Sequence, residues 1–188
     1  PLLFMGEEFG ETAPVNYFGH HSDAALIEAV KKGRMEEFSS FGWDGPIPDP
    51  QEESTFLAST LNIDLRLQGA HRMLHEFYRH LIGMRKTTPP LRDISKKTME
   101  IKGFAKERCL SVHRSAGGDE VVCFYNFHGG TASISPRLKQ GTWRKMLDSS
   151  SPEWGGAAPE TAGRVVGSCS GGAPVSLHPW SAVVYRKV

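Results

Sequence analysis

The chain has 188 residues, of which 39% are hydrophobic and 23% are charged, and its formal net charge at pH 7 is +1. These values are typical of a globular protein and exclude a largely disordered chain. No cluster of basic residues indicates nucleic-acid binding, and no apolar run approaches the roughly 20 residues of a membrane-spanning helix. We therefore expect neither a nucleic-acid nor a membrane partner.

The chain contains three cysteines, Cys109, Cys123 and Cys169, none of which forms a Cys-x-x-Cys pair. This pattern predicts reduced, structural thiols and favours the cytoplasm. The glycine pairs lack the lysine and the following helix of a phosphate-binding loop. We expect no cofactor and no metal ion.

The first residues have the pattern of a buried strand that ends in acidic residues. Four apolar residues, 2–5, stand between Pro1 and Gly6, as in strands of parallel sheets that are buried on both faces. Such a strand needs partners on both sides, and no similar run precedes it. We therefore expect this chain to be the C-terminal piece of a larger protein.

The next ninety residues alternate irregular loops with helices. A loop over residues 10–21 precedes Ser22-Asp23, which stands where a helix N-cap is expected, and residues 24–32 have helical spacing. Gly33 can end or interrupt this helix, and residues 34–41 can continue it.

A second helix is predicted after a proline-rich loop. Pro46, Pro48 and Pro50 enforce irregular backbone. Residues 65–86 then repeat apolar side chains every three or four positions, which predicts a helix packed against a sheet or barrel wall. The helix should end before Thr88-Pro89-Pro90, because a residue that precedes proline is disfavoured in the helical region.

Beyond Asp93 the pattern changes to short runs rich in valine and aromatic residues. Residues 116–119, Ala-Gly-Gly-Asp, predict a hairpin turn, and residues 149–163 predict a surface loop. Short strands at this spacing are typical of an antiparallel sandwich. The expected strands are residues 99–104, 110–114, 120–127, 131–135, 143–147, 164–167, 175–177 and 182–186.

The sharpest site candidates are Glu7 and Glu8, which follow the first predicted strand. Active sites of parallel β/α barrels lie at the carboxyl ends of the strands, although the same residues could cap the next segment or pair with an arginine. His75 and His80 are five residues apart, whereas the zinc-protease helix needs a spacing of four. We expect structural or solvent roles for these histidines and for His71.

Trp143, Trp154 and Trp180 could stack on sugar rings or belong to the core of the β-domain. Aromatic residues of a small β-domain are more often core residues. We expect Trp143, Trp180 and Tyr185 to be buried.

Several motifs resemble the alpha-amylase family of glycoside hydrolases. The run Pro-Leu-Leu-Phe-Met from Pro1, followed by Gly-Glu-Glu-Phe-Gly, resembles the eighth barrel strand of that family. The stretches Gly-Glu-Thr-Ala-Pro from Gly10, Phe-Gly-Trp from Phe41 and Pro-Asp-Pro-Gln from Pro48 resemble its trehalose-releasing members. Residues 60–64 depart from the pattern of these members, which would have Lys-Leu-Asp-Trp there.

The later part of the chain resembles the C-terminal β-domain of the same family. The similar stretches are Val-Val-Cys-Phe-Tyr-Asn-Phe from Val121 and Pro-Trp-Ser-Ala-Val-Val-Tyr from Pro179. The resemblance thus implies the last strand and helix of a (β/α)8 TIM barrel over residues 1–92. An antiparallel β-sandwich would follow over residues 93–188.

The resemblance also implies a retaining glycoside hydrolase that cuts the alpha-1,4 bond next to the terminal trehalose of maltooligosyl trehalose or a related alpha-glucan. In this family the three catalytic carboxylates follow barrel strands four, five and seven, upstream of Pro1, so this chain alone should be inactive. Retaining enzymes need two carboxyl groups about 5 to 5.5 Å apart, whereas Glu7 and Glu8, as neighbours on an extended segment, would point to opposite faces. The residues expected to line sugar subsites are Glu7, Glu8, Glu11, Tyr17 and Phe18.

Other functions remain open at this stage. A glycogen-branching or debranching enzyme would share the strand, but the loop Glu11-Thr12-Ala13-Pro14 and the Pro-Asp-Pro-Gln segment argue against it. A carbohydrate-binding module would need exposed, coplanar aromatic rings on the sandwich. A purely structural β-domain would bury them.

Overall fold

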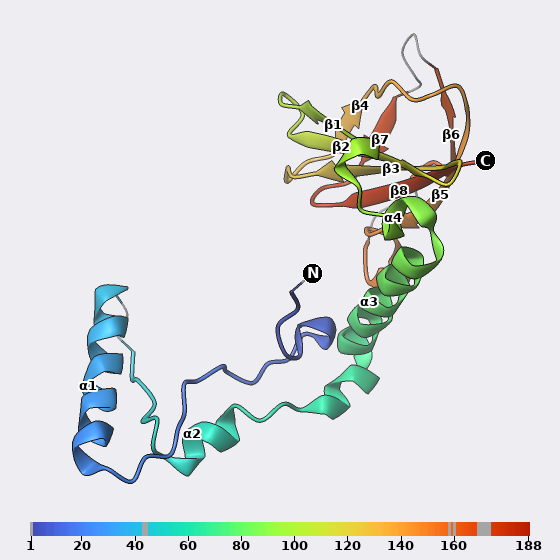
Figure 1. Ribbon diagram of the computed structural model, residues 1–188. Coiled ribbons are helices and arrows are strands. Elements are labelled where there is room, and N and C mark those ends of the chain that lie inside the picture. The colour runs from blue at the N-terminus through green and yellow to red at the C-terminus, as the bar shows by residue number, and fades with distance from the viewer. Residues whose placement is uncertain (1, 43–44, 158, 160, 169–173) are drawn as a thin grey trace. The chain divides into compact units, whose positions relative to one another are not determined.

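The computed structural model describes residues 2–42, 45–157, 159, 161–168 and 174–188 (Figure 1). The chain divides into two units, Pro1–Arg72 and Met73–Val188, and the division falls inside helix α3, Gly69–Thr87. The domain boundary expected between residues 92 and 93 lies farther along the chain and stays a prediction. Cys169 lies outside the described residues.

The first unit consists of short helices joined by extended segments. The helix expected at residues 24–32 is confirmed, and the Asp23 side chain caps it by accepting a hydrogen bond from the Leu26 amide at 2.9 Å. Gly33 neither ends nor interrupts the helix, since a helical glycine costs only about 1 kcal/mol and its neighbours favour helix. The elements are a 3-10 turn Glu7–Phe9, α1 Ala24–Ser40, α2 Glu53–Ala58, a 3-10 turn Ile63–Leu67 and the start of α3.

The strand expected at the N-terminus is not formed. Residues 2–5 have no ladder partner, and Leu2 is 98% exposed. The prediction fails because a strand exists only through hydrogen bonds to its neighbours, and the described residues of the first unit contain no strand to pair with this segment.

The second unit begins with the rest of α3, which confirms the predicted helix and its end before the proline pair. A short helix that the sequence did not predict, α4 Pro89–Arg92, and a 3-10 turn, Lys96–Thr98, follow. Proline fits the first turn of a helix because the amide hydrogen it lacks would have no partner there.

All eight predicted strands are present, most within one or two residues of the expected bounds. Six form one antiparallel sheet in the order β1-β2-β3-β8-β5-β6, and β4 pairs with β7 in a second, two-stranded sheet. The antiparallel all-β architecture is therefore confirmed. The strands are β1 Met99–Phe104, β2 Cys109–Ala116, β3 Asp119–Asn126, β4 Ala132–Ile134, β5 Gly141–Asp148, β6 Arg164–Gly167, β7 Val175–Leu177 and β8 Ala182–Lys187.

The predicted hairpin turn between β2 and β3 is also confirmed. Ala116 pairs with Asp119, and the two residues between them, Gly117 and Gly118, have φ values of 60° and 81°. Positive φ at both central positions is the geometry of a type I′ turn, which glycine adopts without steric cost.

The six-stranded sheet is covered on both faces. On one face, Phe124, Trp143 and Tyr185 pack against the β4–β7 pair through Ile134 and Leu177. Trp143 and Tyr185 are buried as predicted, whereas Trp180 is 72% exposed, so its predicted burial is wrong. Trp180 stands in a turn with a φ of 50°, outside the strands whose alternation buries side chains.

The other face of the sheet carries α3. Met84 and Phe77 of the helix pack against Val121 and Val184 of the central strands, and Phe77 also contacts Trp154 with 5.2 Å between ring centroids. The predicted amphipathic face of α3 is thus used against the sheet.

Asp148 organises the long loop that follows β5. Its carboxylate, nearly fully buried, accepts hydrogen bonds from the Ser150 hydroxyl at 2.6 Å and the Thr161 hydroxyl at 2.7 Å. Burial acts to raise the pKa of the Asp148 carboxyl, but the hydrogen bonds from Ser150 and Thr161 outweigh it and hold the pKa below its usual value of 3.8.

We predict that Asp148→Asn lowers the free energy of unfolding of the chain by about 2 kcal/mol, since hydrogen bonds to a charged group contribute about 1.5 to 3 kcal/mol. Because the folded pKa lies below the unfolded one, the contribution of Asp148 is complete above the unfolded value of 3.8 and is lost as the pH falls through the lower folded value. Urea unfolding between about pH 6 and pH 2 should show a smaller pH dependence in the variant.

The control is Glu153→Gln, which removes an exposed carboxylate from the same loop. It should leave both the stability and its pH dependence unchanged. Equal effects of the two substitutions would contradict the role assigned to Asp148.

Candidate functional site

The acidic segment after residue 5 is a tight turn rather than an extended strand end. Gly6 has a φ of 79°, and its carbonyl accepts hydrogen bonds from the amides of Phe9 at 3.2 Å and Glu11 at 2.9 Å. A Cβ on Gly6 would lie 2.5 Å from the Cβ of Glu11. Both the backbone angle and this close approach therefore require glycine at position 6.

The Glu11 carboxylate joins this turn to a distant segment of the first unit. One oxygen accepts from the amides of Thr12 at 2.7 Å and Ala13 at 2.9 Å, and the other accepts from the Asn62 amide at 2.6 Å. The hydrogen bond from the Ala13 amide is the largest cause of a lowered pKa of Glu11. The carboxylate is therefore held ionised as a tie between backbone segments.

His71, in the first turn of α3, adds a second tie. Its Nδ1 donates a hydrogen bond of 2.8 Å to the carbonyl oxygen of Phe9, which is buried. This contact agrees with the structural role expected for His71.

Two further sets of hydrogen bonds join the loop that follows the turn to the segment around α2. The Asn16 amide donates to the Ser59 hydroxyl at 3.3 Å. The His21 amide donates to the Gln51 side-chain oxygen at 2.9 Å, and the Gln51 side-chain nitrogen donates back to the His21 carbonyl at 3.0 Å. These bonds hold together segments that are 30 to 43 residues apart in the sequence.

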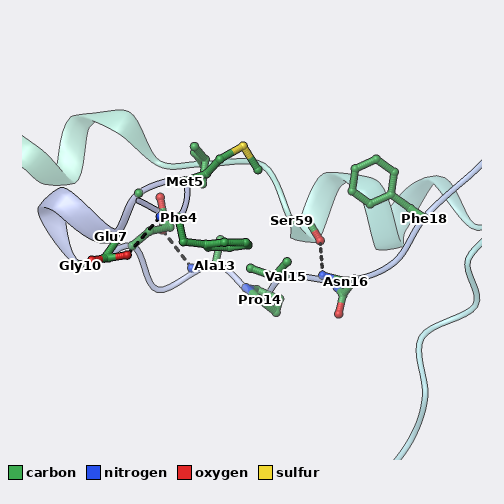
Figure 2. A pocket seen from close by; sticks show the side chains of 13 residues that line it. Phe4, Met5, Glu7, Gly10, Ala13, Pro14, Val15, Asn16, Phe18 and Ser59 are labelled. Atoms are coloured by element: carbon green, nitrogen blue, oxygen red, sulfur yellow. Dashed lines mark hydrogen bonds between the residues drawn. The ribbon is translucent and has the colours of Figure 1, made fainter. Parts of the chain in front are cut away.

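The joined segments enclose a pocket of about 350 Å³ (Figure 2). Figure 2 shows Glu7 and Phe18 at opposite ends of it, with apolar side chains between them. Sugar-binding surfaces need an apolar wall for a ring face and polar groups for hydroxyls, and this lining provides both. The pocket is lined by Phe4, Met5, Gly6, Glu7, Gly10, Glu11, Ala13, Pro14, Val15, Asn16, Phe18, Ser59 and Leu61.

Of the five residues expected to bind sugar, the structure brings Glu7, Glu11 and Phe18 to this pocket. Glu8 and Tyr17 are not among its lining residues. The ring of Tyr17 lies under the Arg34 guanidinium, 5.2 Å from the ring centroid, outside the pocket.

The lining residues differ in their exposure and in their contacts. The Glu7 side chain is exposed and accepts a hydrogen bond from the Phe4 amide at 3.1 Å. The Phe18 ring packs edge-on against Phe56 with 5.2 Å between centroids. Glu11 has both oxygens bonded to backbone amides, so it positions the turn.

The expected geometry of Glu7 and Glu8 needs a correction. They belong to a 3-10 turn, not to an extended segment. Successive side chains of a 3-10 helix point about 120° apart, so the two carboxylates still diverge and the conclusion that they are not a catalytic pair is unchanged.

Sequence reasoning missed the residues that build the pocket, chiefly Gly6, Ser59 and Asn62. A glycine directly after an apolar run is a signal that could have marked the turn at Gly6. No local pattern could have paired Glu11 with Asn62, because the two lie 51 positions apart.

Within the described ranges, no group of three or more His, Cys, Asp or Glu side chains is arranged to hold a metal ion. In the same ranges, no helix is long and apolar enough to cross a membrane.

Residues 105–188 match the model of the alpha amylase C-terminal all-beta domain. The match covers β2 to β8, and it agrees with the resemblance of the later motifs to the family's C-terminal β-domain.

Curated relatives extend the likeness into the first unit. The chain is 45% identical over 123 residues to malto-oligosyltrehalose trehalohydrolase of Rhizobium sp. strain M-11, which covers 65% of this chain and 20% of that protein. The enzyme of the same name from Deinococcus radiodurans is 39% identical over 137 residues, or 72% of this chain and 22% of that protein. The expected resemblance is confirmed, and the chain matches about a fifth of the length of these relatives.

A solved structure has the same fold. A protein of Salmonella typhimurium, described provisionally as an alpha amylase, superimposes with a TM-score of 0.72 at 24% identity, covering 100% of this chain and 28% of that one. Both the β-domain and the segments before it therefore have counterparts in the fold of that protein.

We predict that Gly6→Ala opens the turn that carries Glu7, because the added Cβ clashes with Glu11 and the backbone angle becomes strained. Hydrogen–deuterium exchange should become faster at the amides of Thr12, Ala13 and Asn62, which bond to Glu11.

The matched control is Gly33→Ala in α1, where a Cβ meets nothing within 4 Å. This change should slow exchange in α1, since alanine favours helix over glycine by about 1 kcal/mol. Unchanged exchange at the three amides in Gly6→Ala would refute the proposed constraint at position 6.

Proposed function

We propose that this chain is the C-terminal part of a trehalose-releasing glycoside hydrolase. The whole enzyme would cleave the alpha-1,4 bond next to the terminal trehalose of maltooligosyl trehalose. The observation that carries the proposal is that relatives 38–45% identical to the chain share the name malto-oligosyltrehalose trehalohydrolase. This shared name favours the trehalose-releasing activity over a branching or debranching enzyme.

In this proposal, residues 1–92 complete a (β/α)8 barrel and residues 93–188 form its C-terminal domain. Residues 2–5 would become the eighth barrel strand once neighbouring strands supply hydrogen-bond partners, and their exposed apolar side chains would then be covered. The carboxylates that attack the sugar and transfer the proton would lie in the part of the enzyme that precedes this chain.

The pocket beside Glu7 would contribute to the sugar subsites of the complete enzyme. The exposed Glu7 carboxylate would accept hydrogen bonds from sugar hydroxyls, and the Phe18 ring would offer an apolar face. Glu11 would position the turn from which Glu7 projects. Glu8 and Tyr17 do not line this pocket. They would contact substrate only where the rest of the enzyme brings the substrate to them.

The cytoplasm is the proposed location. Cys109 and Cys123 are buried and unpaired, which supports a reducing compartment. Burial raises the pKa of the Cys123 thiol to about 11, so this thiol is unreactive at neutral pH.

A chimera tests the function directly. The corresponding C-terminal fifth of the Rhizobium enzyme would be replaced by this chain, and trehalose release from maltooligosyl trehalose would be measured. We expect the chimera to release trehalose and the 188-residue chain alone to release none. A folded, inactive chimera, or turnover by the isolated chain, would overturn the proposal.

The role of Glu7 is tested in the same chimera. Glu7→Gln should reduce kcat/KM about ten- to a hundred-fold, since a hydrogen bond to a charged group contributes about 1.5 to 3 kcal/mol. Glu8→Gln is the control and should have a smaller effect. A lower melting temperature with unchanged kinetics for Glu7→Gln would assign this residue to the scaffold.

A further inference from the structure

A second hollow lies on the second unit, on the sheet face that carries the β4–β7 pair. The strap that closes it, residues 135–139, alternates its side chains, with Pro136 and Leu138 buried and Arg137 and Lys139 exposed. The strap therefore packs onto the core from one side and presents two cations on the other.

The hollow has a volume of about 230 Å³, and both polar and apolar groups line it. The strap forms one wall, and the other groups come from β1, β2 and β3. It is lined by Glu100, Lys102, Ser111, His113, Val122, Pro136, Arg137, Leu138 and Lys139.

A half-buried ion cluster fixes one side of the hollow. The Glu120 carboxylate lies 2.8 Å from Lys139 Nζ, 3.3 Å from Lys187 Nζ and 2.9 Å from His113 Nε2. Burial acts to raise the pKa of the Glu120 carboxyl, but the hydrogen bonds from Lys139 and Lys187 outweigh it and lower the pKa. This cluster anchors the strap to the central strands.

Two cations at the hollow are left without a carboxylate partner. In the described part of the chain, no Asp or Glu lies within ion-pair distance of Lys102 or Arg137, and the Lys102 ammonium lies over the Phe104 ring, 5.2 Å from its centroid. Glu100 is the only acidic residue among those that line the hollow. The lining therefore has an excess of positive charge, with Ser111 and His113 as additional hydrogen-bonding groups.

We propose that this hollow binds a small phosphate-type oxyanion, either free or as the phosphate ester of a sugar, between Lys102 and the strap residue Arg137. The guanidinium of arginine matches phosphate oxygens with paired donors, and lysine adds a point charge. No Phe, Tyr or Trp side chain is among the residues that line the hollow, so it lacks the large apolar ring on which a neutral sugar usually stacks. The site is separate from the pocket beside Glu7 and does not depend on the proposed hydrolase activity.

The test is isothermal titration calorimetry of the 188-residue chain with inorganic phosphate and, separately, with glucose 6-phosphate, at low ionic strength. We expect saturable binding. Equal affinity for the two ligands would assign the site to the phosphate group itself, and tighter binding of the ester would assign it to a sugar phosphate. The absence of saturable binding of either ligand at concentrations up to about 10 mM would overturn the proposal.

Substitutions that remove a positive or a negative charge from the hollow should change the binding affinity in opposite directions. Lys102→Gln and Arg137→Gln should each weaken binding about ten-fold, because each removes one charged donor. Glu100→Gln should tighten it, since a repulsive charge is lost. The control, Lys86→Gln, changes an exposed lysine on α3, the helix on the opposite face of the sheet.

Lys102 and Arg137 are exposed, so the variants should keep the melting temperature of the parent chain, which is measured in parallel. If Lys86→Gln weakens binding as much as Arg137→Gln does, the interaction is nonspecific attraction and the proposed site is refuted.

Discussion

The second unit depends on the insertion of its last strand into the middle of the sheet. β8 pairs with β3 on one side and with β5 on the other, so the final residues of the chain separate two halves that have no direct ladder between them. Val183 and Tyr185 pack on one face of the sheet and Val184 on the other. A strand buried on both faces contributes to both cores at once, and neither core can close before it is in place. Pairing over such sequence separations forms late, because the entropy of closing the loop must be lost first.

Asn126, at the end of β3, completes the junction at which β8 begins. Its side-chain nitrogen donates to the carbonyls of Gly130 at 2.9 Å and His178 at 2.8 Å, and its oxygen accepts from the His128 amide at 2.9 Å. The amide of Asn126 itself donates to the Ser181 carbonyl at 2.9 Å. One buried side chain thus satisfies backbone groups of two separate turns, which an apolar residue of the same size could not do. The turn that leads into β8 is held in register by polar contacts, and the strand itself is held by apolar ones.

The sequence could predict the features that depend on neighbouring residues, such as strand bounds, and not those that depend on contacts between distant segments. Strands β6 and β7 were predicted with correct bounds because each alternates burial along its own length, and the period of two is a local property. The hairpin turn at Gly117 and Gly118 was predicted for the same reason. The order of the strands, with β8 between β3 and β5, could not be derived, since local periodicity carries no information about partners.

The misses have the same origin. Residues 2–5 have the composition of a buried strand, but composition describes the environment that a segment needs, not the neighbours that are present. Trp180 was expected in the core because it is large and apolar, whereas its position in a turn with positive φ turns it outward. At the pocket, Glu7, Glu11 and Phe18 all line the same hollow, and their binding of sugar stays a prediction. The sequence could not indicate that the Glu11 carboxylate accepts hydrogen bonds from the Ala13 and Asn62 amides, because the bond to Asn62 joins residues far apart in the chain.

The two units are held together by different interactions, and the difference affects how the pocket could serve a larger enzyme. Among the described residues of the first unit, the buried ones are Gly6, Phe9, Pro50 and Thr55, and the segments are joined mainly by hydrogen bonds. Hydrogen bonds near the surface contribute little net stability but define direction well. The turn that carries Glu7 can thus be aimed accurately by Glu11 and His71 without a large core of its own, provided that a more stable framework holds its surroundings. The second unit differs, since its sheet and the part of α3 within it pack into two apolar cores of their own. A site whose direction comes from polar ties and whose stability comes from packing elsewhere can lose activity through a single substitution while the protein remains folded.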